Sequence, residues 1–169
     1  MVDAPRLLLL VGAATPPGRL AAAIALAAQA ARTGSGDVAV DILNLAETPI
    51  DICDGRALDS YGESTRGAVR RIAMAGAVLI GAPVYRASYP GVLKNLLDIV
   101  PVEALQSKPV GIVAMGGSPH HYLAVDSQLR QVLAWFGEDL AALAGTLITL
   151  ARRLDPASLG PVPLAAKFT

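Results

Sequence analysis

Aromatic and polar residues gather in a short segment between an apolar strand and a helix. The segment Val84–Tyr89 holds two tyrosines, an arginine and a serine, and it follows the small and apolar run 76–82. Pro90-Gly91 then precedes residues that are apolar at helical spacing as far as Val100. Open α/β sheets bind ligands at the carboxyl ends of their strands, so we expect a flat, conjugated ligand here. An ordinary βα loop whose tyrosines pack on the sheet is the alternative.

A second candidate loop, 12–19, also follows a strand and precedes a helix. In that position, backbone N–H groups and the helix dipole favour a phosphate group. The prolines at 16 and 17 lack the amide hydrogens that would bind an anion, which leaves Thr15 and Arg19 as the side-chain ligands. The alternative is that these residues only begin the helix and that Arg19 is solvated.

A third loop, Gly116-Gly117-Ser118, follows another apolar strand. Glycine tolerates backbone angles closed to other residues, so this loop is expected to bring backbone donors close to the edge of a ring. His120 and His121 come next but have no acidic or thiol partner at metal-ligand spacing, so no metal site is predicted. We expect His121 to be structural and His120 to be a loop or nucleotide contact.

Two of these segments resemble one known family. The run Pro83–Gly91, followed by Leu93-Lys94 and Leu97-Asp98, resembles the flavin-facing loop of the NAD(P)H-dependent FMN reductases that supply alkanesulfonate-type two-component monooxygenases. The stretch Gly116–Asp126 is similar to the third flavin loop and following helix of that family. Thinner similarity extends from about Arg6 to Gly145. The resemblance implies FMN as the flavin and NADPH or NADH as its reductant.

The resemblance also implies how the site would work. Hydride would pass from the nicotinamide C4 to the flavin N5, which needs orientation and no side-chain base, so no catalytic side chain is predicted. The family usually has hydroxyl residues where this chain has Ala13, Gly18 and Leu20, which fits a flavin that is held weakly and exchanged as a substrate. Arg86, inside the flavin-facing loop, would meet a phosphate of NADPH or of a neighbouring flavin, and the alternative is a salt bridge that faces a partner. The predicted cofactor contacts are Thr15, Arg19, Pro83, Val84, Tyr85, Arg86, Ala87, Ser88, Tyr89, Gly116, Gly117 and Ser118.

The expected function is therefore an NAD(P)H-dependent FMN reductase that passes reduced FMN to a flavin-dependent monooxygenase. One alternative keeps FMN bound and reduces a quinone or azo compound. A second is a flavin-binding electron carrier or regulatory module that oxidises no nicotinamide. The 14 basic and 14 acidic residues cancel, which weakens the carrier hypothesis because small carriers often dock through a strongly charged face.

Composition limits the class of protein. The 169 residues are 53% hydrophobic and 17% charged, which indicates one globular domain. Scattered charges suggest no nucleic-acid partner, and no apolar stretch reaches the ~20 residues of a membrane span. The N-terminal residues do not read as a signal peptide, so a cytoplasmic location is expected. Cys53 is the single cysteine, which excludes an internal disulfide.

Strand and helix patterns alternate along the chain. They predict a flavodoxin-like doubly wound five-stranded parallel sheet, order 2-1-3-4-5, with helices on both faces. In that order the loops after Gly12 and Ala82 face one crevice, and Pro83, which has no N–H, is expected to end the pairing of its strand. The domain is expected over 1–154, followed by a tail over 155–169. The predicted strands are 6–12, 38–43, 77–82, 109–115 and 146–150, and the predicted helices are 19–32, 64–74, 91–100 and 123–136, with a long loop over 46–62.

The helix predicted over 91–100 is apolar on more than one face. Part of it is therefore expected to be buried against another subunit. We expect a homodimer or homotetramer, as in the family that the chain resembles.

Overall fold

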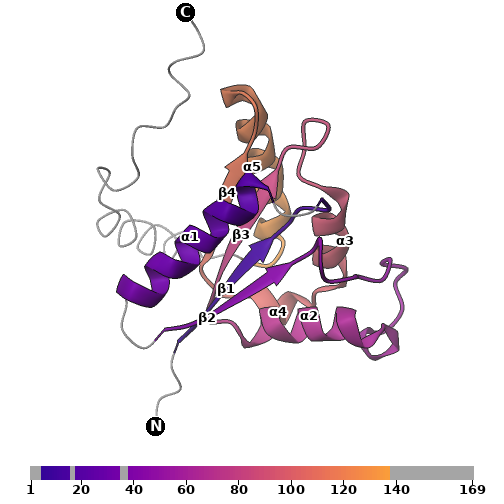
Figure 1. Cartoon of the computed structure of the whole chain (residues 1–169). Helices are drawn as coiled ribbons and strands as arrows, with labels where there is room; N and C mark the ends of the chain where they lie inside the picture. Colours follow the sequence, from indigo (N-terminus) through magenta and orange to yellow (C-terminus); the bar gives the residue numbers. More distant parts are fainter. Residues whose placement is uncertain (1–4, 16–17, 35–37, 138–169) are drawn as a thin grey trace, which may run out of the picture.

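Four parallel strands form a sheet between helices in the computed structural model, which describes residues 5–15, 18–34 and 38–137 (Figure 1). The strand order is β2-β1-β3-β4, which confirms the predicted order for these four strands. The predicted fifth strand, 146–150, and the tail lie outside the described residues. The elements are β1 (Arg6–Val11), α1 (Arg19–Gly34), β2 (Ala39–Asn44), η1 (Leu58–Ser60), α2 (Glu63–Met74), β3 (Ala77–Pro83), α3 (Gly91–Ile99), α4 (Val102–Leu105), β4 (Val110–Met115) and α5 (Pro119–Ala134).

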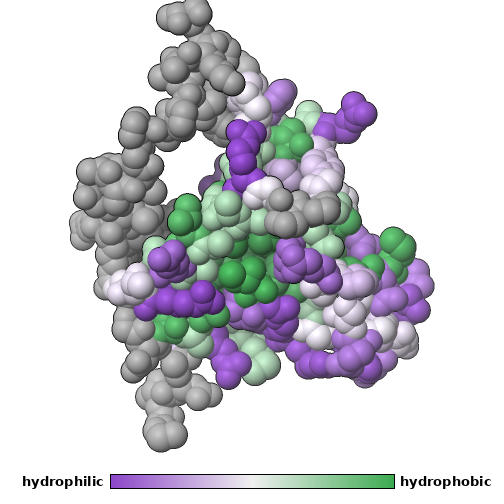
Figure 2. Space-filling view, in the orientation of Figure 1, coloured by the Kyte–Doolittle hydropathy of each residue, from purple (hydrophilic) through white to green (hydrophobic). Residues whose placement is uncertain are grey.

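The side chains of successive residues of β1 point to opposite faces of the sheet. Leu8 and Leu10 belong to the larger core, which α2, α3 and α5 cover, whereas Leu9 and Val11 belong to the smaller core under α1. All four side chains are at most 3% exposed, which explains why this strand is an unbroken apolar run. Figure 2 shows the face that α1 crosses, where hydrophobic surface lies between polar residues. Helices therefore cover both faces, as predicted.

Most predicted element boundaries agree with the structure within about two residues, and three features differ. Helix α5 begins at Pro119 rather than Leu123, because proline suits the first turn of a helix, where no intrahelical acceptor is needed. The short helices η1 and α4 were not predicted. Pro83 does not end the pairing of β3: it pairs with Met115, and the N–H of Val84 donates to the Met115 carbonyl at 2.9 Å. Proline is tolerated because β1 pairs with β3 only as far as Gly81.

Helix α3 is buried within the chain itself. Leu93, Leu96, Leu97 and Ile99 are between 0% and 8% exposed, and all belong to the larger core. The apolar residues that were expected to need a second subunit are thus covered by elements of the same chain. The oligomeric state stays a prediction, but the apolar residues of α3 no longer support it.

The long loop before α2 is anchored at two points. Asp51 Oδ2 accepts hydrogen bonds from the Gly62 N–H at 2.9 Å and from the Thr65 hydroxyl at 2.6 Å, and the bond from Thr65 is the main reason that the pKa of Asp51 is lowered. The Asn95 amide group donates to the Asp51 carbonyl at 2.8 Å and accepts from the Cys53 N–H at 2.9 Å. These contacts hold the loop against α2 and α3.

Loop 12–15 is joined to β3 at Gly12, whose N–H donates to the Gly81 carbonyl at 2.8 Å. A Cβ atom at Gly12 would lie 2.9 Å from Leu93 Cδ2 and 3.0 Å from the Gly81 carbonyl oxygen. The leucine side chain can rotate, but the carbonyl belongs to the backbone of β3, which is held by pairing with β1 and β4. Close approach of the backbone thus requires glycine at position 12.

Replacing Gly12 with alanine should destabilise the fold. We expect the Gly12→Ala variant to lose about 1–3 kcal/mol of unfolding free energy through overpacking, measured by urea denaturation. Gly18→Ala is the matched control, because a Cβ at Gly18 meets nothing within 4 Å. Equal stability of the two variants would contradict the proposed constraint.

Candidate functional site

The first and second loops meet at the carboxyl edge of the sheet. The Thr15 and Tyr85 hydroxyl oxygens lie 3.2 Å apart, although 70 residues separate them along the chain. Thr15 follows β1 and Tyr85 follows β3, and these strands are neighbours. The structure therefore brings together the two loops that the strand order predicted to share a crevice.

A shallow cleft lies between these loops and encloses about 150 Å³. Ligand pockets usually enclose about 300–1,000 Å³, so this cleft can hold part of a nucleotide-sized ligand but not all of it. Four predicted contacts are among its lining residues, and Asn44 and Met115, which were not predicted, line it as well. These two residues end β2 and β4, so their position at strand ends is the signal that could have identified them. The four predicted residues are Thr15, Arg19, Pro83 and Tyr85.

The segment Tyr85–Ser88 forms a two-residue hairpin turn. The Tyr85 N–H donates to the Ser88 carbonyl at 2.7 Å, and the Ser88 N–H donates back to the Tyr85 carbonyl at 3.0 Å. The central residues, Arg86 and Ala87, have φ values of 50° and 60°. Positive φ at both central positions is the type I′ pattern, which normally uses Asn-Gly or Gly-Gly. Left-handed backbone costs non-glycine residues roughly 1–2 kcal/mol each.

This turn leaves two backbone donors available. Within the part of the chain that the structure describes, the N–H groups of Arg86 and Ala87 have no hydrogen-bond acceptor. They lie next to Tyr85, whose side chain lines the cleft. The turn can therefore offer two hydrogen-bond donors to a ligand beside an aromatic ring.

The glycines of the third loop do not use left-handed backbone angles. Neither Gly116 nor Gly117 has a positive φ; among the described glycines, only Gly55 and Gly137 do. The unusual backbone angles of the site are at Arg86 and Ala87 instead. The loop still follows β4 at the same edge of the sheet, and the Ser118 carbonyl accepts the His121 N–H at 3.1 Å at the start of α5.

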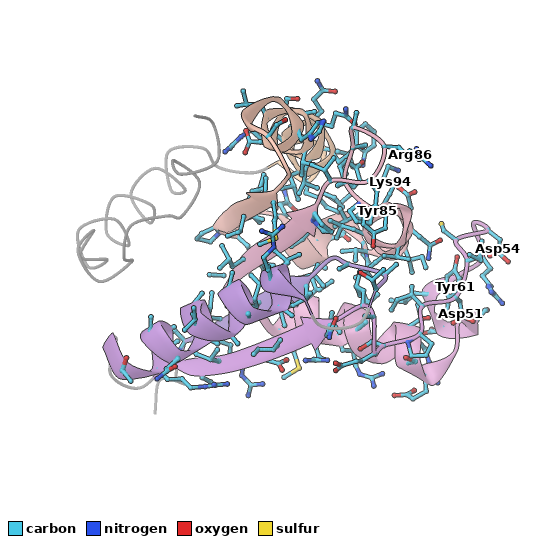
Figure 3. All side chains as sticks on the ribbon, turned by 45° about the horizontal axis from the view of Figure 1, so that its top comes forward. Asp51, Asp54, Tyr61, Tyr85, Arg86 and Lys94 are labelled. Carbon is cyan, nitrogen blue, oxygen red and sulfur yellow. The ribbon has the colours of Figure 1, made fainter. Side chains whose placement is uncertain are left out.

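Positive charge is available at two places near the cleft. Arg19 is the first residue of α1, where the helix dipole also favours an anion. Arg86 is exposed at the turn, and neither arginine has an acidic partner among residues 5–15, 18–34 and 38–137. Lys94, by contrast, is paired with Asp98, whose hydrogen bond raises the pKa of this lysine. Figure 3 shows Tyr85, Arg86 and Lys94 in one region of the molecule.

The remaining predicted contacts fall into two groups. Val84 and Tyr89 are partly buried and pack against the larger core, and burial raises the pKa of the Tyr89 hydroxyl. Ala87 and Ser88 contact Gln128 of α5 through hydrogen bonds. Neither group is among the residues that line the cleft.

The described residues contain neither a metal-ligand cluster nor a membrane-spanning helix. No three His, Cys, Asp or Glu side chains gather there as they would around a metal ion. No helix among the described residues is both long enough and apolar enough to cross a bilayer.

Known proteins share both the sequence pattern and this fold. The profile of the family described as NADPH-dependent FMN reductase matches residues 5–141. The chain belongs to this family. A crystal structure of NADH:FMN oxidoreductase (EMOB) in its apo form matches with a TM-score of 0.67 and 30% identity, covering 79% of this chain and 70% of that one.

Curated relatives in the family match shorter regions. An NAD(P)H-dependent FAD/FMN reductase of Geobacillus thermodenitrificans is 36% identical over 100 residues, which are 59% of this chain and 54% of the relative. The NADH-dependent FMN reductase SfnF of Pseudomonas putida is 46% identical over 68 residues, 40% of this chain and 37% of the relative. The matched regions thus span about half or less of these relatives.

Proposed function

We propose that the protein is an NAD(P)H-dependent FMN reductase that passes hydride from NADH or NADPH to FMN and releases reduced FMN to a flavin-dependent monooxygenase. The observation that supports it most is the meeting of loop 12–15 with the Tyr85–Ser88 turn at one cleft, in a chain of this family. The monooxygenase partner rests on the resemblance of Pro83–Gly91 to the flavin loop of reductases that supply such enzymes.

Residues in the cleft and in the loops beside it would bind the different parts of FMN. Arg19 and the N-terminus of α1 would bind the phosphate, since an arginine and a helix N-terminus both favour an anion. The ring system would lie beside Tyr85, with the N–H groups of Arg86 and Ala87 as donors to its oxygen and nitrogen atoms. Gly116 to Ser118 would face the pyrimidine edge, which their position after β4 supports.

The protein would bind FMN and the nicotinamide nucleotide and orient their rings. Bound FMN would supply the redox chemistry by accepting a hydride at N5 from the nicotinamide C4. The described residues would align the two rings, and no side chain would act as an acid or a base. Thr15 would steady the Tyr85 hydroxyl as well as contact the phosphate.

Weak retention of FMN is supported by two buried side chains. Ala13 and Leu20 occupy positions where the family usually has hydroxyl groups, and they are 7% and 5% exposed within the core under α1. They offer no hydrogen bond to a phosphate. A flavin held mainly by Arg19 and the backbone is suited to exchange between proteins.

Oxidation of NADH and NADPH by the purified protein, with and without added FMN, tests the proposal. We expect oxidation to depend on added FMN, because the cleft is shallow and offers few phosphate ligands. The decrease in nicotinamide absorbance measures the rate. Activity without added FMN that requires a quinone or azo dye would support a bound-flavin reductase instead, and inactivity with both nucleotides would support a flavin-binding carrier.

Arg19→Ala should weaken FMN binding. Loss of a charge-assisted hydrogen bond is worth about 1.5–3 kcal/mol, so Kd should rise by about 10–100-fold, measured by quenching of flavin fluorescence. Arg32→Ala is the matched control, because Arg32 lies exposed in the last turn of the same helix. Unchanged affinity in Arg19→Ala would indicate that Arg19 is only a solvated helix residue.

A homodimer or homotetramer is also proposed, now on different grounds. An open groove of about 330 Å³ lies between α3 and α5, and Trp135 at its edge is 79% exposed. Exposed tryptophan beside apolar surface is typical of protein interfaces.

We expect Trp135→Glu to lower the mass measured by light scattering to that of a monomer. The control is Met74→Glu, which alters an exposed apolar residue of α2 and should keep the wild-type mass.

A further inference from the structure

We infer that Gln128 is a positioning residue of the flavin site, because its side-chain amide holds the Tyr85–Ser88 turn in the shape that presents two backbone N–H groups. This inference rests on the proposed function for its ligand. The turn itself, and the contact that holds it, are features of the described structure.

Gln128 reaches the turn from α5 and contacts two consecutive residues. Its Oε1 accepts a hydrogen bond from the Ser88 hydroxyl at 2.5 Å, and its Nε2 donates to the Ala87 carbonyl at 3.1 Å. A carbonyl can only accept, so the amide nitrogen must face Ala87 and the amide oxygen must face Ser88. Both ends of the amide are thereby used, and the orientation of the side chain is defined.

The turn needs such support because its central residues are not glycine. Arg86 and Ala87 both have left-handed backbone, which their Cβ atoms disfavour. Two backbone hydrogen bonds close the turn, and the amide of Gln128 adds two more from outside it. Strained backbone persists where the surroundings determine it from several sides. Without Gln128, Arg86 and Ala87 would be free to relax toward ordinary backbone angles.

This arrangement assigns a different task to Ser88. The sequence predicts Ser88 as a direct contact of the flavin, but its hydroxyl hydrogen is used in the bond to Gln128. Ser88 therefore acts on the turn, and the N–H groups of Arg86 and Ala87, which have no acceptor in the described chain, would be the donors to the ligand. The residues that would contact FMN are thus distinct from Ser88 and Gln128, which would shape the contact.

Removal of the Gln128 side chain should leave the rest of the fold intact. Gln128 is exposed, so truncating it creates no cavity. Its neighbour Leu129 is fully buried and holds α5 against the larger core. A change in the turn can therefore be measured without global unfolding.

The test compares Gln128→Ala and Gln128→Glu with the wild-type chain. Glutamate has the same size but would place an acceptor against the Ala87 carbonyl, so both variants should lose the support. Without flavin, amide hydrogen exchange of Tyr85 and Ser88, followed by NMR, should become about tenfold faster, and Kd for FMN should rise by about tenfold. Gln131→Ala is the control, since Gln131 is exposed on the same helix and has no hydrogen-bonded side-chain partner among the described residues.

A rescue variant separates positioning from general stability. Glycine has no Cβ to disfavour positive φ, so adding Ala87→Gly to Gln128→Ala should restore most of the affinity and slow the exchange again. Unchanged exchange in Gln128→Ala would overturn the inference. Faster exchange with unchanged FMN affinity would overturn its link to the ligand. FMN binding by the wild-type chain tests the proposed function itself, so the two failures are distinguishable.

Discussion

The pairing of β1 with β3 is the constraint on which the rest of the structure depends. Both strands are buried between helices, and the Gly12 N–H extends their contact by donating to the Gly81 carbonyl at 2.8 Å. Because the strands are parallel, their carboxyl ends reach the same edge and the loops that follow must meet there. The 3.2 Å contact of Thr15 with Tyr85 is the consequence.

The proposed site combines rigid strand ends with a strained turn. Pro83, Asn44 and Met115 end the strands under the cleft, and their backbone is set by the sheet. The turn above them is closed by local hydrogen bonds and by one side chain from α5. Such a division suits a protein that binds and releases a flavin, since the sheet maintains the geometry while few groups hold the ligand.

Sequence patterns predicted correctly the features that a local physical rule governs. They failed for features that depend on contacts with other segments of the fold. Apolar runs and helical periods predicted the four described strands and their helices, since burial sets those patterns. The rule that proline ends a strand failed at Pro83, because β1 no longer pairs beside it. Glycine at 116 and 117 permits unusual angles, yet the left-handed residues of the proposed site are Arg86 and Ala87, which no sequence rule indicated. The apolar faces of α3 suggested a second subunit, but this chain covers them.

The sequence by itself determined the strand order of the described sheet, the resemblance to the FMN reductases, and the meeting of Thr15, Arg19 and Tyr85 at one edge. These follow from burial and from the rules of parallel sheets, which act through patterns local to each segment. Only the tertiary structure decided that Asn44 and Met115 line the cleft and that Gln128 holds the turn. The Arg-Ala turn has no sequence signature, because its left-handed backbone is stabilised partly by a side chain about 40 residues away.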